Sequence, residues 1–247
     1  MKIVSLVPSQ TELLYDLGLG EQIYGQTKFC IHPMERGKNA QMIGGTKNLN
    51  IERILAIKPD LIIGNKEENE KEQIALLQTQ CDTCISDIAN FEDALAMIAK
   101  VGELTHSSIK ATSMIDKISD AFDKLKPLPI QPKNAIYVIW DSPLMTAGQG
   151  TFINDMLQKT GFVNAIESTR YPQITENELQ KLKPAYVLLS SEPYPFKEKH
   201  IEKFKKMLPD SDVLLVDGEM FSWYGSRMIK AADYFISLQK EFLTRAQ

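Results

Sequence analysis

Residues 50–69, NIERILAIKPDLIIGNKEEN, decide the fold because a second version of this stretch occurs later in the chain. From Ile174 the sequence reads ITENELQKLKPAYVLLSSEPYPF. In both copies a short amphipathic helix ends at Lys-Pro, an apolar strand follows the proline, and the strand leads into an acidic loop. Proline cannot continue a helix and favours extended geometry in the residue before it, so each Lys-Pro separates a helix from a strand. A repeated unit of this kind, centred on Pro59 and Pro184, predicts two similar lobes.

Length, charge and hydropathy narrow the class of protein. The 247 residues suffice for one large domain or two small ones, each able to bury a core. A formal net charge of −4 gives no support for nucleic-acid binding, and no apolar run approaches the roughly 20 residues of a membrane-spanning helix. The start, MKIVSLVPSQTELL, lacks the apolar stretch and cleavage site of a signal peptide. We therefore expect a periplasmic or cell-surface protein if a leader was removed, and a cytoplasmic one if Met1 is the native start.

Strands and helices alternate along the chain, which predicts an α/β fold with mostly parallel sheets. Besides the strands after the two prolines, apolar runs predict strands at residues 3–7, 23–25, 83–86, 135–140 and 213–216. Ser9 and Glu12 show the capping-box spacing, so the first helix is expected to begin at Ser9. Further helices are expected at residues 70–78, 151–160 and 226–244, with loops at 143–150 and 217–225.

A helical pattern in the middle of the chain predicts a connection between the lobes. It runs from residue 90 to about 126, with a break near Gly102. Its second half repeats apolar residues every three or four positions, so we expect a rigid helix of about 20 or more residues. The chain then has three parts: an N-terminal α/β lobe at residues 1–103, an interlobe helix at 104–128 and a C-terminal α/β lobe at 129–247.

The loops that follow the strands are the expected ligand contacts, because ligands of open α/β sheets bind at the carboxyl ends of the strands. In a two-lobe repeat these loops would face each other across a cleft. Trp140, Trp223 and Tyr224 suit a flat, partly apolar ligand, or alternatively cover the core of their own lobe. Arg227 at the start of a helix favours an anionic group, or alternatively is a solvated surface residue. The remaining candidates are Lys28, Phe29, Cys30, His32, Asn65 and Tyr171.

Three cysteines and three histidines limit metal and redox chemistry. Cys30 and His32 are one residue apart in a loop and could form half of a metal site, although no zinc-binding pattern completes it. Cys81 and Cys84 show the C-x-x-C spacing of a redox pair, but two partly buried free thiols are the simpler interpretation. No nucleophile elbow, phosphate-binding loop or dinucleotide-binding motif is present, so we expect a binding protein and no catalytic residues.

Three stretches of the chain resemble a known family. They are IVSLVPSQTELLYDLGL at residues 3–19, GTKNLNIERILAIKPDLIIG at 45–64 and SPLMTAGQGTFINDMLQKTGFVNAI at 142–166. Together they resemble the class III substrate-binding proteins of ABC importers, which take up cobalamin, haem and siderophores, and they are most similar to the cobalamin-binding branch. The resemblance implies two α/β lobes joined by one long helix, with the ligand in a cleft between the lobes. It implies no intrinsic cofactor, a corrinoid, haem or ferric chelate as the transported ligand, and a monomer.

The resemblance also implies a membrane permease as partner, contacted through an acidic side chain on each lobe. The candidates are Glu67, Glu68, Glu70 and Glu72 on the first lobe and Glu192 and Glu198 on the second. The repeat independently pairs Glu67 with Glu192, since each lies 8 residues after its proline.

Two departures from the cobalamin-binding branch leave the ligand open. Asn65 stands where that branch has an aromatic residue, and the loop KFCIHP at residues 28–33 differs from the usual aromatic loop. Haem, a siderophore or another metal chelate are therefore alternatives to cobalamin. Two other functions compete with transport: a cytosolic metal or corrinoid carrier or sensor of the same fold, and an enzyme that uses Cys30 or His32.

Overall fold

The computed structural model describes residues 1–35, 37–125 and 133–245, and the chain divides into two compact units. Unit 1 comprises Met1–Ile88, Glu92–Ser119 and Tyr224–Ile229. Unit 2 comprises Ala89–Phe91, Asp120–Trp223 and the described chain from Lys230 onward. Each unit is an α/β lobe with its own sheet and core, so the predicted two-lobe α/β fold is confirmed.

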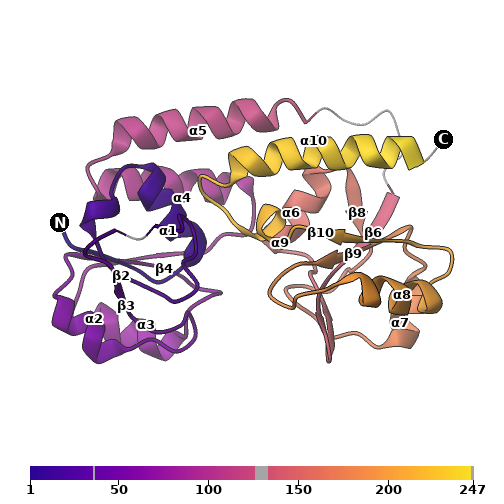
Figure 1. The fold of residues 1–247 in the computed structure, drawn as a ribbon, viewed down its shortest axis with the longest axis horizontal. Coiled ribbons are helices and arrows are strands. Elements are labelled where there is room, and N and C mark those ends of the chain that lie inside the picture. The colour runs from indigo at the N-terminus through magenta and orange to yellow at the C-terminus, as the bar shows by residue number, and fades with distance from the viewer. Residues whose placement is uncertain (36, 126–132, 246–247) are drawn as a thin grey trace. The chain divides into compact units, whose positions relative to one another are not determined.

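Unit 1 contains a parallel sheet with strands in the order β3-β2-β1-β4-β5. The strands are β1 (Ile3–Ser5), β2 (Ile23–Gln26), β3 (Gln41–Met42), β4 (Leu61–Asn65) and β5 (Thr83–Ser86). The helices are α1 (Pro8–Asp16), the 3-10 turn η1 (Gly20–Gln22), α2 (Ile51–Ile57), α3 (Lys71–Gln78), most of α4 (Phe91–Leu104) and the first part of α5 (Ser108–Phe122). Helices α2 and α3 lie on one face of the sheet, and α1 and α4 lie on the other (Figure 1).

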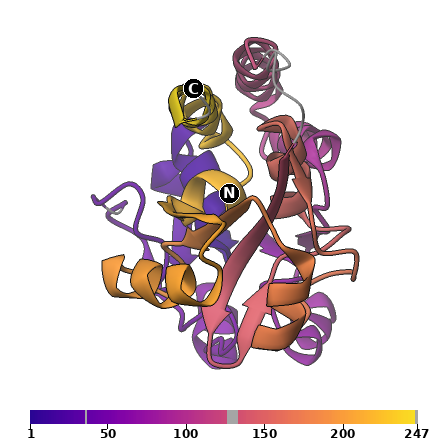
Figure 2. The same cartoon turned by 90° about the vertical axis from the view of Figure 1, so that its right-hand side faces the viewer.

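Unit 2 contains a mixed sheet in which β6 pairs with three other strands. The strands are β6 (Lys133–Asp141), β7 (Leu144–Thr146), β8 (Phe162–Asn164), β9 (Tyr186–Ser190) and β10 (Asp212–Val216), and β7 alone among them runs antiparallel. The helices are α6 (Phe152–Lys159), α7 (Glu176–Leu182), α8 (Glu198–Met207), α9 (Gly218–Ser222) and most of α10 (Met228–Arg245). Helices α7 and α8 cover one face of this sheet, and α6 and α10 cover the other (Figures 1 and 2).

The repeated helix–proline–strand unit is present in both units with the same backbone geometry. Lys58 is the C-cap of α2 and Lys183 is the C-cap of α7, and both lysines adopt the left-handed conformation, with φ of 54° and 44°. Each proline follows at once, and a fully buried five-residue strand begins two residues later. The Lys-Pro pair therefore separates a helix from a strand in each unit, as the sequence predicts, and it does so with the same backbone geometry in both.

Apolar side chains from these repeated elements form the core of each unit. In unit 1, Val4 and Ile62 on the sheet pack with Ile54 of α2 and Leu77 of α3. In unit 2, the corresponding cluster joins Val138 and Val187 on the sheet to Leu179 of α7 and Phe204 of α8. Burial of this apolar surface is the main force that fixes each sheet against its helices.

The long connecting helix predicted for residues 104–128 is shorter than expected. It is interrupted at residues 105–107, and α5 has 15 residues. The break predicted near Gly102 is this interruption at residues 105–107, and Gly102 itself lies inside α4 and serves helix packing. A Cβ atom at Gly102 would lie 2.4 Å from Ala111 Cβ of α5, so only glycine allows this approach. Residues 126–132, where the prediction ended, lie outside the described chain.

Three other local predictions are wrong. Val7 is the N-cap of α1, with Pro8 in the first turn and no side-chain cap, so Ser9 and Glu12 form no capping box. Proline suits this position because its φ is already helical and its missing N–H would lack a partner there anyway. The expected loops at residues 143–150 and 217–225 contain strand β7 and helix α9. Both elements are too short for a periodic sequence signal.

Candidate functional site

The carboxyl edge of the sheet in unit 1 is lined by polar residues. Strands β1, β2, β4 and β5 end in Ser5, Gln26, Asn65 and Ser86. The first turn of α1 follows β1 directly, and its residues PSQTE at 8–12 are all buried. We call these strand-end residues and residues 8–12 the polar layer. Burying a polar group costs free energy unless the group is hydrogen-bonded, so the partners of the polar layer have to be identified.

Asn65, a predicted ligand contact, is buried at the end of β4 and shapes the acidic loop. Its side-chain Oδ1 accepts hydrogen bonds from the backbone N–H groups of Glu67 (2.8 Å) and Glu68 (3.3 Å). Its Nδ2 donates to the carbonyl and hydroxyl oxygens of Ser86, both at 3.1 Å. Asn65 is only 1% exposed, so the structure gives it a role in positioning the acidic loop.

Arg227, the predicted anion-binding residue, forms a buried ion pair with Glu12. Its Nε and Nη2 atoms each lie 2.7 Å from a different carboxylate oxygen of Glu12, a bidentate arrangement. Arg227 is 5% exposed and Glu12 is 6% exposed. Such geometry is typical of strong charge-assisted hydrogen bonds, and it neutralises the arginine charge inside unit 1.

The loop after β2 carries Lys28, Phe29, Cys30 and His32. Lys28 and Phe29 are exposed, with Lys28 Nζ 5.0 Å from the centre of the Phe29 ring, and His32 is half-buried. Cys30 is buried, and its Sγ lies 3.1 Å from Thr11 Oγ1 and 3.2 Å from Thr27 Oγ1. Burial raises the pKa of the Cys30 thiol, so it stays protonated near neutral pH, whereas metals bind the thiolate.

The other two cysteines lie between α3 and β5 and within β5. Cys81 and Cys84 are partly buried free thiols. Burial raises the pKa of both thiols, which lowers the fraction of reactive thiolate. Within the described residues, no cluster of three or more potential metal ligands is present.

Trp140 is the most exposed of the predicted aromatic contacts in unit 2. It lies near the carboxyl end of β6, is 38% exposed, and packs edge-to-face against Tyr194 with ring centres 5.5 Å apart. The Tyr194 hydroxyl lies 3.3 Å from Nε2 of the buried His200. The sequence interpretation missed Tyr194 and His200, although Tyr194 follows Glu192 in the repeated acidic loop.

Trp223 and Tyr224 differ from Trp140 because both are buried, at 8% and 5% exposed. Trp223 Nε1 and Ser222 Oγ donate to Glu192 Oε1, at 2.8 and 3.0 Å. Burial raises the pKa of the Glu192 carboxyl, while these hydrogen bonds act in the opposite direction. Tyr171 is half-buried in the loop before α7.

The predicted docking carboxylates occupy different environments. Glu72 in the first turn of α3 and Glu198 in the first turn of α8 are exposed. Glu67, Glu68 and Glu70 are partly buried, and Glu70 lies 3.5 Å from Lys47 Nζ. These six positions, Glu192 included, remain predictions for permease contact.

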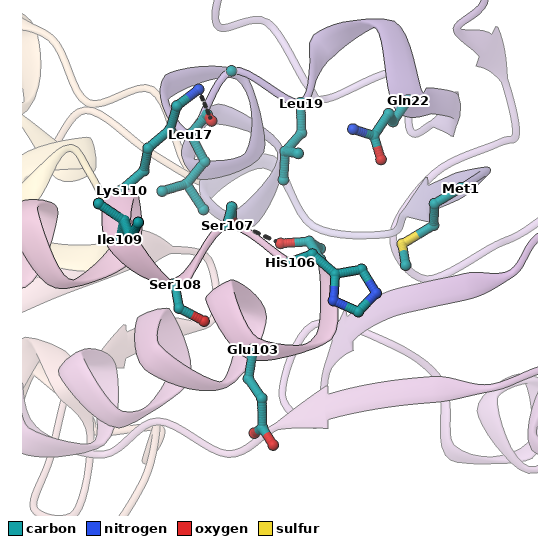
Figure 3. A pocket seen from close by; sticks show the side chains of 12 residues that line it. Met1, Leu17, Leu19, Gln22, Glu103, His106, Ser107, Ser108, Ile109 and Lys110 are labelled. Atoms are coloured by element: carbon teal, nitrogen blue, oxygen red, sulfur yellow. Dashed lines mark hydrogen bonds between the residues drawn. The ribbon is translucent and has the colours of Figure 1, made fainter.

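A hollow of about 810 Å³ lies in unit 1 beside the C-terminal end of α1 (Figure 3). Its lining includes Met1, Leu17, His106 and Lys110, and Lys110 Nζ donates to the Leu17 carbonyl at 2.9 Å. None of the predicted ligand contacts lines it. Met1 precedes β1, so the hollow lies at the edge of the sheet opposite to the polar layer.

No helix in residues 1–35, 37–125 or 133–245 is both long and apolar enough to span a membrane.

Comparisons with known proteins agree on one class. The family described as periplasmic binding protein matches residues 3–211. The ABC transporter substrate-binding lipoprotein YvrC of Bacillus subtilis is 29% identical over 213 residues, which cover 82% of this chain and 66% of YvrC. The vitamin B12-binding protein of Yersinia pestis is 27% identical over 199 residues, which cover 76% of this chain and 69% of that protein. The periplasmic heme-binding protein RhuT of Roseiflexus has the same fold, with a TM-score of 0.81 at 20% identity over 97% of this chain and 98% of RhuT.

Proposed function

This chain belongs to the periplasmic binding protein family, and from that premise we propose that it is the substrate-binding subunit of an ABC importer for a metal chelate. The family match spans 209 residues (211 − 3 + 1) and so includes parts of both units. The observation that carries the ligand class is Trp140, a partly exposed indole ring held edge-to-face by Tyr194. A rigid aromatic surface of this kind suits the flat, partly apolar face of a macrocycle.

The ligand is a corrinoid, a haem or a ferric siderophore that is carried and released. A Yersinia pestis relative is named for vitamin B12 and the structural neighbour RhuT for haem, which supports a macrocyclic metal chelate. The raised pKa of the Cys30 thiol argues against a bare metal ion held by Cys30 and His32. The metal therefore arrives inside the chelate, with no resident cofactor and no turnover.

The partner is a membrane permease, and the protein acts on the outer side of the cytoplasmic membrane as a monomer. The names of the relatives, a substrate-binding lipoprotein and a periplasmic protein, support this location. Glu72 and Glu198 are the docking candidates that are most available, because both are exposed in the first turns of helices. The cleft expected between the lobes stays a prediction.

Titration with cobalamin, cobinamide, haem, ferric siderophores and divalent metal ions tests this proposal. A ligand at 100 times its Kd stabilises the folded state by about 2.7 kcal/mol, so binding is visible as a rise in Tm. Trp140→Ala is expected to weaken chelate binding. Leu215→Ala is the matched control, because Leu215 is a 39% exposed apolar residue of the same unit, comparable with the 38% of Trp140. If no chelate raises Tm, the proposal fails; if only a bare metal ion does, a metal carrier replaces it.

A further inference from the structure

An aromatic cluster in unit 2 runs from the solvent into the interior. Trp140 is its exposed end at 38%, Tyr194 is half-buried, and Phe196 and His200 are buried at 5% and 6% exposed. The ring centre of Tyr194 lies 5.5 Å from that of Trp140 and 5.5 Å from that of His200. Tyr194 is therefore the ring that joins the exposed indole to the buried imidazole.

The imidazole of His200 has a defined hydrogen-bonding state. His200 lies in the first turn of α8, whose N-cap is Lys197. The backbone N–H of Lys197 lies 2.8 Å from His200 Nδ1, and the Lys197 carbonyl oxygen lies 3.2 Å from the same atom. A backbone N–H can only donate, so Nδ1 accepts the shorter contact and the ring hydrogen is assigned to Nε2.

The second nitrogen of His200 binds the hydroxyl of Tyr194. Nε2 lies 3.3 Å from the hydroxyl oxygen, to which it donates in this tautomer. Both nitrogens of the buried ring then have partners, which removes the cost of burying them. A capping box needs only an acceptor for the N-cap N–H, which glutamate usually supplies. The imidazole adds a donor that a carboxylate lacks, and this donor holds the Tyr194 hydroxyl.

Helix α8 is also tied directly to the end of β6. Lys203 Nζ donates to Asp141 Oδ1 at 2.6 Å, and Asp141 follows Trp140 in the chain. Lys203 lies three residues after His200, so the two side chains lie on the same face of α8. The ion pair keeps the backbone beside Trp140 close to α8, where the Tyr194 ring packs against the indole.

We propose that Tyr194 and His200 are positioning residues that hold the Trp140 ring in one orientation for ligand binding. This inference rests on the proposed function, in which Trp140 contacts the ligand. A side chain that is ordered before the ligand arrives loses less conformational freedom on binding. The two residues therefore raise affinity by acting on Trp140.

Iodide quenching of tryptophan fluorescence tests the orientation of Trp140 in the ligand-free protein. The chain has two tryptophans, and Trp140→Phe gives the background from the buried Trp223. Tyr194→Phe keeps the packed ring and removes the hydroxyl. His200→Asn keeps an acceptor near the Nδ1 position for the N-cap N–H, but its side chain is too short to reach the Tyr194 hydroxyl.

Both substitutions are expected to raise the quenching of Trp140. Loss of one hydrogen bond shifts the equilibrium between the held and the free ring by about two- to tenfold. The double variant is expected to resemble either single variant, because both changes remove the same bond. Tyr186→Phe is the matched control, since it removes the same atom in unit 2 from a ring that packs against Phe162 and Phe242. It is expected to leave the quenching of Trp140 unchanged.

Cobinamide, haem and ferric siderophores are the probes for binding. Tyr194→Phe and His200→Asn are expected to weaken the probe that the wild type binds by about two- to tenfold, and Tyr186→Phe to leave its Kd unchanged. A lower Tm with unchanged quenching, additive effects in the double variant, or an unchanged Kd despite raised quenching overturns the proposal. If the wild type binds no probe, the proposed function fails, and the quenching alone decides whether Tyr194 and His200 position Trp140.

Discussion

Trp223 donates the hydrogen of its indole Nε1 to Glu192 Oε1 across 2.8 Å, within unit 2. The sequence suggested separate roles for these residues, ligand contact for Trp223 and permease docking for Glu192. In the structure the carboxylate is partly buried and also accepts a hydrogen bond from Ser222. Glu192 therefore couples the acidic loop of unit 2 to the segment that contains Trp223.

Glu192→Gln is expected to stabilise the protein at neutral pH. Burial raises the pKa of the Glu192 carboxyl in the folded protein. A raised carboxyl pKa means that folding favours the protonated form, so the stability contributed by Glu192 falls as the pH rises from about 4 through the folded pKa. Glutamine keeps the acceptor for Trp223 and removes this loss. The Tm of the variant minus that of the wild type is expected to be positive at pH 7 and to shrink toward zero below pH 4.

Glu198→Gln is the control for that experiment, because Glu198 is exposed at the start of α8. It is expected to show no comparable pH-dependent offset. A constant Tm difference for Glu192→Gln across the whole pH range would show that the carboxyl pKa is not the cause.

Removal of one member of the Glu12–Arg227 pair is expected to destabilise the protein strongly. Arg227→Met or Glu12→Leu leaves a buried charge without its partner, which costs about 3 to 5 kcal/mol. The double variant is expected to be much closer to the wild type, since both charges are gone. Urea unfolding of the four proteins measures the coupling. A small effect of Arg227→Met alone, combined with weaker ligand binding, would instead support the anion-binding role predicted from sequence.

Glycine at either left-handed lysine is expected to raise stability. Lys58 and Lys183 have φ of 54° and 44°, a conformation that costs a residue with a Cβ atom about 1 kcal/mol. Lys58→Gly and Lys183→Gly relieve this cost in unit 1 and unit 2, and chemical denaturation measures the gain. Lys181→Gly, two residues earlier within α7, is the opposite control and is expected to lose about 1 kcal/mol. Similar losses at all three positions would contradict the strain argument.

Cys30 is expected to resist alkylation in the folded protein. Burial raises the pKa of its thiol and shields the sulfur, whereas Cys81 and Cys84 are only partly buried. A thiol-reactive dye is therefore expected to label Cys81 and Cys84 first and Cys30 only after unfolding. Mass spectrometry of the labelled peptides identifies the sites. Rapid labelling of Cys30, together with a Tm shift by Zn²⁺ that Cys30→Ala abolishes, would restore the metal-site hypothesis.

Local sequence signals were sufficient to predict the two α/β units and most of their strands. The Lys-Pro repeat predicted the boundary between helix and strand in both units, and β5 was predicted with its observed bounds, Thr83–Ser86. These features depend on neighbouring residues, namely a proline or an apolar run. The same reasoning failed where a distant partner decides the outcome. Glu12 was assigned to a helix cap because its true partner, Arg227, lies 215 residues away.

The site was less predictable than the fold for the same reason. Trp140 and Trp223 look alike in sequence, yet one is 38% and the other 8% exposed, because packing within unit 2 decides their burial. Asn65 was expected to contact ligand, but its side chain is used by the backbone of the following loop.

The segment Tyr224–Ile229 belongs to unit 1 although the rest of that unit ends at Ser119. A ribosome that adds roughly 5 to 20 residues per second makes Arg227 roughly 10 to 40 s after Glu12, given their separation of 215 residues. During that interval the carboxylate of Glu12 lacks the Arg227 guanidinium that it binds in the folded unit. The unit that is translated first is therefore finished only after most of unit 2 has left the ribosome, and a nascent chain stalled before residue 224 carries an incomplete first lobe.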